Sequence, residues 1–186
     1  MLKNKTVFVV SHPDDETLWA GGLIQQTPGA VVICCSIPRR DPVRADKFVD
    51  ACRVLGATPR LIMVEESAPN EPLPGVDFLD LEEFDHIITH GAAGEYGHYH
   101  HMFVHHFVKN KYHHKKLSFF GFREGEQRGE HRLNLDDEMW ETKFHALQKY
   151  NHVSPSDGME KWIALLNRYE KQGYEIGVES YDGAKI

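Results

Sequence analysis

Residues 6–11 (TVFVVS) form a continuous apolar run, rich in β-branched side chains, that stops abruptly at a polar cluster. A run without polar alternation is typical of a strand that is covered on both faces, as in a parallel sheet. The polar cluster at residues 12–16 reads HPDDE, so one imidazole and three carboxylates follow the strand directly. Ligands of open α/β sheets bind beyond the carboxyl ends of the strands. The sequence therefore predicts a functional site at the end of its first strand.

Apolar runs and segments of helical spacing alternate along the rest of the chain. Strands are expected at 6–11, 30–36, 60–64, 86–89 and 117–120, and helices at 15–26, 44–55, 101–108, 137–150 and 156–171. Loops are expected at 68–75, 91–97 and 123–132, where proline, glycine or charged residues gather. Strands that alternate with helices favour the α/β class. We expect a Rossmann-like single domain over residues 1–186, with a mainly parallel sheet flanked by helices.

The composition limits the partners and the location of the protein. The chain has 28 acidic and 21 basic residues, a net charge of -7, whereas nucleic acids are held mainly by clustered lysine and arginine. The three cysteines cannot build a disulfide framework and offer no set of C-x-x-C pairs for a structural zinc ion. The apolar run at 7–10 is too short for a membrane span or a signal-peptide core. We therefore expect a cytoplasmic protein that has no membrane span and binds no nucleic acid.

A second polar segment follows the strand expected at 86–89. Residues 94–101 read GEYGHYHH and contain an acid, two tyrosines and three histidines. If the strands at 6–11 and 86–89 are neighbours, both polar segments meet in one crevice and offer the ligands of a zinc ion with an open position. Such a site can hydrolyse an amide. A divalent metal lowers the pKa of its bound water from about 15.7 to about 7, and a nearby carboxylate takes the proton.

Together, HPDDE at 12–16 and GEYGHxxH at 94–101 resemble the signature of the LmbE-like, or PIG-L, family of N-acetylglucosaminyl deacetylases. Strand order and motif spacing extend the resemblance loosely over nearly the whole chain, which would form one such deacetylase domain. The resemblance implies a metal-dependent hydrolase that removes an N-acetyl group from an amino-sugar derivative. Its cofactor would be Zn²⁺ or another divalent metal such as Fe²⁺, and its substrate a small molecule.

The resemblance also implies roles for individual residues. His12, Asp15 and His101 would bind the metal, and Asp14 would be the general base for the metal-bound water. Arg44, at the start of the helix after the second strand, would contact the substrate.

Two further residues of the second segment would act on the substrate's acyl group. His98 would stabilise the oxyanion or protonate the leaving amine. Tyr96, two residues earlier, would polarise the acyl carbonyl. Both roles are implied by the resemblance.

Two positions depart from the family pattern. Tyr99 and His100 lie between the motif histidines, where the family usually carries a pair such as Pro-Asp. The missing acid would have oriented His98, so that His100 either takes over this orientation or offers an alternative metal ligand. Lys47 lies three residues after Arg44, where the family tends to carry an acid. Substrate contacts on that side are therefore expected to differ.

Each motif also has an interpretation without catalysis. The acids at 14–16 could cap a helix and occupy its first turn, and His98 and His101 could be surface residues at a helix start. Alternative functions are an amidase of the same fold acting on another small amide, and a metal- or sugar-binding protein that has lost catalysis. The remaining histidines are expected to be mostly without a role: His86, His90, His105, His106, His113, His114, His131, His145 and His152.

Overall fold

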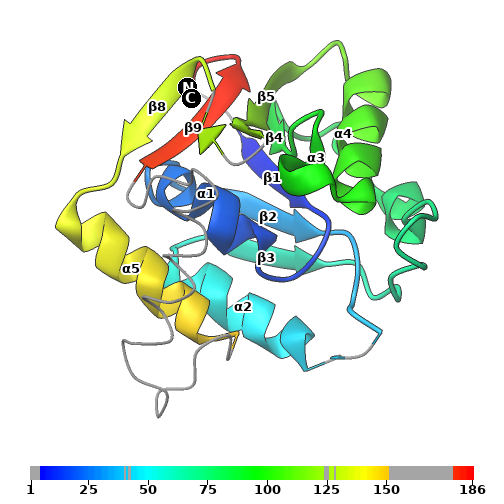
Figure 1. The fold of residues 1–186 in the computed structure, drawn as a ribbon, viewed down its shortest axis with the longest axis horizontal. Coiled ribbons are helices and arrows are strands. Elements are labelled where there is room, and N and C mark those ends of the chain that lie inside the picture. Colours follow the sequence, from blue (N-terminus) through cyan, green and yellow to red (C-terminus); the bar gives the residue numbers. More distant parts are fainter. Residues whose placement is uncertain (1–4, 40, 42, 124–125, 128, 151–177) are drawn as a thin grey trace.

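A seven-stranded sheet with the order β3-β2-β1-β4-β5-β9-β8 forms the centre of the protein (Figure 1). The computed structural model describes residues 5–39, 41, 43–123, 126–127, 129–150 and 178–186. The parallel strands are β1 (Thr6–Val10), β2 (Val31–Cys34), β3 (Thr58–Leu61), β4 (His86–Thr89) and β5 (Lys116–Phe120). The antiparallel strands β9 (Val178–Gly183) and β8 (His131–Asn134) complete one edge, and β6 (Phe122–Arg123) pairs with β7 (Glu126–Gln127) in a separate ribbon.

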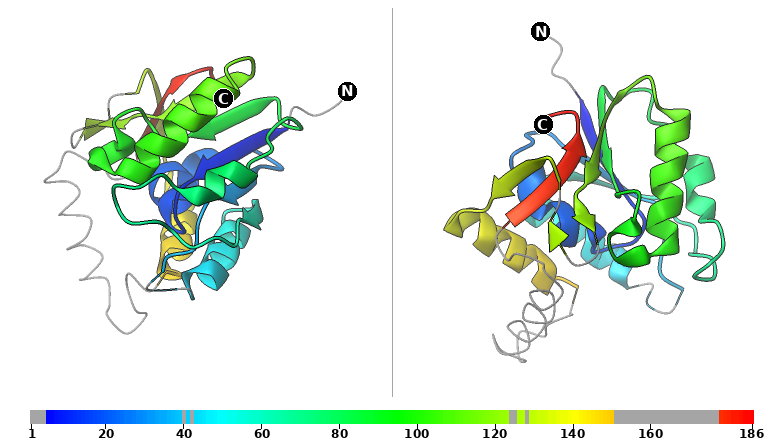
Figure 2. Two further views of the ribbon diagram at one scale, coloured as in Figure 1. Left: turned by 90° about the vertical axis from the view of Figure 1, so that its right-hand side faces the viewer. Right: turned by 45° about the horizontal axis from the view of Figure 1, so that its top comes forward.

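Helices cover both faces of this sheet (Figure 2). On one face lie α1 (Asp15–Gln25), α2 (Arg44–Val54) and α5 (Asp137–Gln148). Their apolar side chains share a core with Phe8 and Val10 of β1. Because side chains alternate between the faces of a strand, the intervening residues of β1 point the other way.

The opposite face is covered by α4 (Tyr99–Lys111) and by the 3-10 helix η1 (Pro74–Phe78), which pack against Val7 and Val9 of β1. The short helix α3 (Gly94–Gly97) precedes α4. No helix within the described ranges is long and apolar enough to cross a membrane. The mainly parallel sheet with helices on both faces confirms the expected α/β architecture.

The first and fourth strands are neighbours in the sheet. β1 pairs in parallel with β4 in the register Thr6↔His86 to Val9↔Thr89. Residues 7–10 are fully buried, because helices cover β1 on both sides. The strands at 6–11 and 86–89 are therefore neighbours, as the meeting of the two polar segments requires.

Several expected boundaries are corrected by the structure. The third strand covers Thr58–Leu61 and not 60–64, because its register with β2 pairs Thr58 with Val31. The helix expected at 101–108 is longer, Tyr99–Lys111, and the expected loop at 91–97 contains α3.

The expectation of a surface loop at 123–132 is wrong. This segment contributes to β6, β7 and β8, and β8 pairs with β9, a strand that the sequence analysis did not identify. Every second residue of β8 is exposed at the edge of the sheet, so its polar composition is compatible with a strand. The helix expected at 156–171 lies outside the described residues.

A buried ion pair joins α5, β9 and α1. Lys143 Nζ lies 2.6 Å from Glu179 Oε1, and both residues are almost fully buried. Glu179 also accepts hydrogen bonds from the backbone N–H groups of Gly22 (2.8 Å) and Leu23 (2.9 Å). These groups lie just after the break in α1 at Ala20 (φ -140°, ψ 15°), where helical partners are lost. The carboxylate therefore caps the second half of α1.

We expect Lys143→Met to lower the free energy of unfolding by about 3–5 kcal/mol, because Glu179 would stay buried without its counter-charge. Chemical denaturation followed by circular dichroism measures the difference. Lys109→Met, at an exposed position of α4, is the matched control and should change the stability by less than about 0.5 kcal/mol. A loss as small as that of the control would contradict a stabilising role for the pair.

His86 begins β4 as a buried imidazole. The residue is 4% exposed, and its Nε2 lies 2.8 Å from Ser118 Oγ of β5. Burial disfavours the charged ring, and the charge of Lys116 adds to this effect, so that the pKa of His86 falls from 6.5 to about 4. Between these pH values the unfolded chain binds a proton at this residue more readily than the folded chain.

Stability should therefore decrease as the pH falls from 6.5 towards about 4, with His86 contributing up to about 3 kcal/mol of the change. His86→Asn removes the titrating group, so the unfolding free energy of this variant should depend less steeply on pH in this range. His113→Asn, at an exposed position, should keep the wild-type slope. Equal slopes for the wild type and His86→Asn, from denaturation curves at each pH, would refute the assignment.

Candidate metal centre

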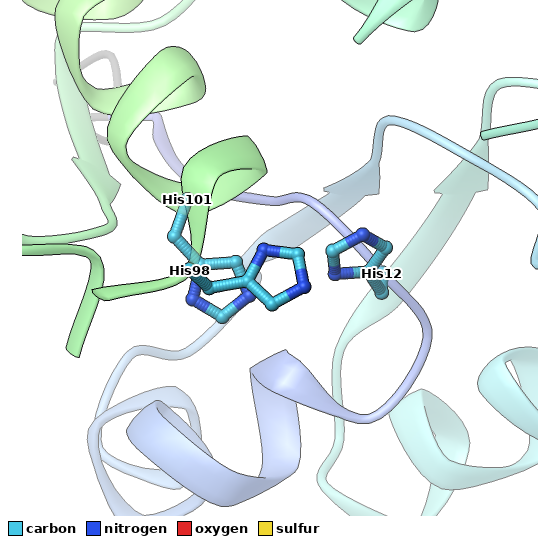
Figure 3. Close-up of side chains that lie close together, drawn as sticks. All are labelled: His12, His98 and His101. Atoms are coloured by element: carbon cyan, nitrogen blue, oxygen red, sulfur yellow. The ribbon is translucent and has the colours of Figure 1, made fainter. Parts of the chain in front are cut away.

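The two polar segments meet at one edge of the sheet (Figure 3). His12 follows β1, and His98 and His101 lie at the start of α4, which follows β4. The ring centroids of His98 and His101 are 4.5 Å apart in a stacked arrangement. The ring of His12 lies 4.8 Å from that of His98 and 5.4 Å from that of His101. The expected meeting of the two segments is thus observed.

Possible metal ligands are grouped closely at this edge. Among the described residues the groups are His12, His98 and His101; His12, Glu66 and His100; and Asp15, His90 and His101. The predicted ligands His12, Asp15 and His101 are divided between these groups. Asp15 links the two histidines through different oxygens, since Oδ2 lies 3.4 Å from His12 Nδ1 and Oδ1 lies 3.3 Å from His101 Nε2. Asp15 therefore lies beside both imidazoles, although the three predicted ligands do not together form one of these close groups.

Glu95 determines which nitrogen of a neutral His101 ring carries the lone pair. Glu95 Oε2 lies 2.5 Å from His101 Nδ1. An ionised carboxylate only accepts hydrogen bonds, so Nδ1 carries the hydrogen and the lone pair lies on Nε2. This buried Nε2 has no hydrogen-bond partner among the described residues. A buried lone pair beside Asp15 is the arrangement that a metal ligand requires.

His100 determines the tautomer of His12 in a similar way. His100 Nε2 lies 3.2 Å from the carbonyl oxygen of Ala68, which only accepts, so the hydrogen of a neutral ring lies on Nε2. The lone pair on His100 Nδ1 then accepts from His12 Nε2, 3.0 Å away. This leaves the lone pair of His12 on Nδ1, the nitrogen that faces Asp15. The sequence left two roles open for His100, the orientation of His98 or an alternative metal ligand. In the structure, His100 makes its hydrogen bond to His12 and not to His98.

Sequence reasoning left out two residues of this network, Glu95 and His90. His90 Nδ1 lies 2.9 Å from Glu95 Oε2, and its Nε2 accepts from the backbone N–H of Ser11 at 3.0 Å. Because the lone pair on Nε2 is already engaged, His90 supports the site and is poorly placed to bind a metal. The position of Glu95 within GEYGH was the one available signal for its role.

The carboxylates at this site favour a positive charge between them. Burial alone would raise the pKa of Asp15, but the neighbouring imidazoles, His101 foremost, hold it well below its usual value. Burial also opposes ionisation of Glu95, yet His90 and His101 lower its pKa to about 2. Burial opposes a charge on His101, but Asp15 and Glu95 outweigh this effect and raise its pKa to about 10. A divalent cation can replace this proton, so the residues present fit a metal.

Asp14 has a strained backbone that helix capping does not explain. Its φ of 111° lies in a region that residues with a side chain rarely adopt, and its carboxylate makes no capping hydrogen bond to α1. The carboxylate instead pairs with the guanidinium of Arg44, which also donates to the carbonyl of Pro13 at 2.5 Å. The second described non-glycine residue with a positive φ is Glu95 (φ 57°). Strained residues of this kind concentrate at functional sites.

Glu16 holds the turn that carries Asp14. One of its oxygens accepts from the backbone N–H of Asp14 at 3.0 Å, and the other accepts from the hydroxyls of Thr17 (2.5 Å) and Tyr150 (2.6 Å). Burial raises the pKa of Glu16 to about 7. The third acid of HPDDE is therefore a structural residue, for which the sequence analysis proposed no separate role.

His98 and Tyr96 lie at the outer side of the centre. His98 is half-buried, and its buried Nδ1 has no hydrogen-bond partner among the described residues. Burial, with the neighbouring charges of His101 and His12, lowers the pKa of His98 to about 3. Tyr96 is 61% exposed, with its ring centroid 5.7 Å from that of His98. His98 is thus itself one of the grouped imidazoles, and Tyr96 lies beside it.

Comparison with known proteins identifies the fold. The sequence matches no protein-family model, and no curated protein matches it. The structure is similar to N,N'-diacetylchitobiose deacetylase from Pyrococcus horikoshii, with a TM-score of 0.64, 16% identity, and 96% of this chain and 83% of that chain covered. The zinc-inhibited form of teicoplanin deacetylase gives a TM-score of 0.62 at 13% identity, with 98% and 99% covered. GalB, the 4-carboxy-2-hydroxymuconate hydratase from Pseudomonas putida, gives 0.61 at 16% identity, with 98% and 97% covered.

These neighbours include LmbE/PIG-L-type deacetylases, so the chain has the fold that the resemblance implied. Identities of 13% and 16% establish a shared fold alone. A hydratase has the same fold, and the chemistry of this chain must therefore be argued from its own side chains.

Because Glu95 orients His101, Glu95→Gln should weaken metal binding about 10- to 100-fold, the usual cost of losing an outer partner of a metal ligand. Isothermal titration with Zn²⁺ and Co²⁺ measures the affinity. Glu138→Gln, at an exposed position of α5, is the matched control and should bind as the wild type does. Identical affinities for the wild type and Glu95→Gln would show that Glu95 does not act on the metal ligands.

Proposed function

We propose that this chain is a metal-dependent N-deacetylase that hydrolyses the N-acetyl group of an amino-sugar derivative. The observation that carries the proposal is the tautomer arrangement of His12 and His101. Hydrogen bonds to His100 and Glu95 leave the lone pairs of these rings on the nitrogens that face Asp15. The fold shared with a diacetylchitobiose deacetylase and a teicoplanin deacetylase supports the reaction class.

A divalent metal held by His12, Asp15 and His101 would lower the pKa of a water molecule and polarise the acyl carbonyl. Asp14 accepts the proton of the attacking water as general base. We propose that Arg44 holds the Asp14 carboxylate in place through its ion pair. The sequence had predicted a substrate contact for Arg44 instead.

The remaining steps fall to His98 and Tyr96. Water adds to the acyl carbon, the carbon–nitrogen bond breaks, and the amine nitrogen takes a proton, so acetate and a free amine are released. His98 donates a hydrogen bond to the oxyanion or supplies the proton to the leaving amine. Tyr96, at the exposed rim beside His98, polarises the acyl carbonyl from the solvent side.

The polar cavity beside His98 is a reason to propose a small amino-sugar as the substrate. The cavity has a volume of about 500 Å³ and is lined by Arg39, Glu66, Ser67, Ala68, Pro69, His98 and His100. Side chains that donate and accept hydrogen bonds suit the hydroxyl groups of a sugar. The similarity to a chitobiose deacetylase is consistent with such a ligand.

Zn²⁺ is the proposed cofactor, with Fe²⁺ as the alternative, because two imidazoles and a carboxylate accept either ion. The similar teicoplanin deacetylase has a zinc-inhibited form, so activity should be measured over a range of metal concentrations. The cytoplasmic location and the single-domain organisation stay predictions.

Two other functions are kept as alternatives. An amidase of the same fold acting on another small amide would use the same residues. A metal- or sugar-binding protein without catalysis is favoured by His100, which replaces the acid expected between the motif histidines. The strained, Arg44-paired Asp14 favours catalysis, since a binding site has little use for a second carboxylate beside Asp15.

Asp14→Asn should lower kcat/KM for acetate release about 10²- to 10⁴-fold while the protein keeps its metal, because the general base is lost and the ligands stay. Acetate release from a panel of N-acetylglucosamine derivatives, with metal analysis of each variant, tests this. Asp137→Asn, exposed on α5, is the matched control. Loss of the metal in Asp14→Asn would reverse the roles of Asp14 and Asp15, and no acetate release by metal-loaded wild type would favour the alternative functions.

A further inference from the structure

We propose that His12, Glu66 and His100 form a second metal-binding position that competes with the first for His12. We call the position formed by His12, Asp15 and His101 the inner position, and that formed by His12, Glu66 and His100 the outer position. One possible ligand atom from each outer residue lies within 4.8 Å of the other two. Neither His100 nor Glu66 is a ligand of the inner position, although His100 accepts the hydrogen bond that sets the tautomer of His12 there.

The distances at the outer position fit a tetrahedral metal. His12 Nε2 lies 3.0 Å from His100 Nδ1 and 3.7 Å from Glu66 Oε2. Ligands bound at about 2.1 Å in a tetrahedron are separated by about 3.4 Å. The observed separations lie on either side of this value, so small side-chain movements would complete the coordination.

The surrounding hydrogen bonds also suit metal binding at the outer position. The Ala68 carbonyl keeps the hydrogen of His100 on Nε2 and leaves its Nδ1 lone pair facing His12. If His12 takes its other tautomer, its Nδ1–H points to Asp15 Oδ2, 3.4 Å away, and its Nε2 becomes free to bind. Each ligating histidine would then give its second N–H to an oxygen, as metal-bound histidines usually do.

His12 cannot serve both positions as a neutral ring, because a neutral imidazole has one nitrogen lone pair. A metal at the inner position requires the lone pair on His12 Nδ1, and a metal at the outer position requires it on Nε2. Occupation of the outer position therefore removes a ligand from the inner one. If the proposed function is correct, on which this consequence rests, excess metal inhibits the enzyme.

A metal ion can reach the outer position from solvent. Glu66 and His100 line the cavity of about 500 Å³, and the Glu66 side chain is 28% exposed. His100 is the most buried of the three ligands, at 2% exposure, and His12 is 9% exposed. The carboxylate at the entrance provides the negative charge that attracts a cation.

His101→Ala isolates the outer position, because it removes an inner ligand and leaves all three outer ligands, His12, Glu66 and His100, unsubstituted. Titration with Zn²⁺ by calorimetry, and with Co²⁺ by absorption spectroscopy, should show that tight binding is lost and that one weaker equivalent remains. Adding Glu66→Gln removes a direct ligand. It should therefore weaken the remaining binding by more than the 10- to 100-fold cost of losing a residue that only hydrogen-bonds to a ligand. Adding Glu65→Gln, an exposed neighbour paired with Arg39, is the matched control and should have no effect.

Absence of any metal binding in folded His101→Ala would overturn the outer position, as would equal effects of Glu66→Gln and Glu65→Gln. Asp15→Asn provides a second background if His101→Ala does not fold by circular dichroism. A wild-type protein that binds no metal would refute the proposed function as well. Tight wild-type binding with no weaker equivalent in either background would refute the outer position alone.

Discussion

The parallel pairing of β1 with β4 brings together two polar segments, 12–16 and 94–101, that lie far apart in the sequence. The carboxyl ends of parallel neighbours share one edge of the sheet, so His12 after β1 and His101 after β4 face each other across Asp15. Two oxygens that only accept, from Glu95 and the Ala68 carbonyl, then determine where the ring hydrogens lie. The proposed chemistry depends on the strand pairing and on these two hydrogen bonds.

Strain and its compensation are concentrated around the same edge. Asp14 and Glu95 are the described non-glycine residues with positive φ, and such conformations cost of order 1–3 kcal/mol each. Hydrogen bonds to Glu16 and the ion pair with Arg44 hold Asp14, while His90 and Gly91 hold Glu95. The surrounding structure thus maintains the strained backbone of both Asp14 and Glu95, whose carboxylates point into the site.

Much of this structure is predictable from the sequence, and the parts that are not predictable have identifiable physical reasons. Buried strands such as 6–11 and 86–89 are visible because apolar runs covered on both faces have a strong local signal. β8 and β9 are not, because the polar edge strand β8 and its neighbour β9 owe their conformation to pairing with a partner far away in the chain. The candidate ligands can be proposed from the two motifs, whereas the contacts that set the ring tautomers depend on the three-dimensional structure. This holds for Ala68 and also for Glu95, although Glu95 is part of the second motif.

A crystal structure of the zinc-loaded protein, with an anomalous difference map recorded at the zinc edge, would test the metal centre most directly. We expect one strong peak within about 2.0–2.2 Å of His12 Nδ1, an Asp15 oxygen and His101 Nε2. A peak that leaves Asp15 and His101 without metal contact, or the absence of any peak at this edge of the sheet, would contradict the proposed centre.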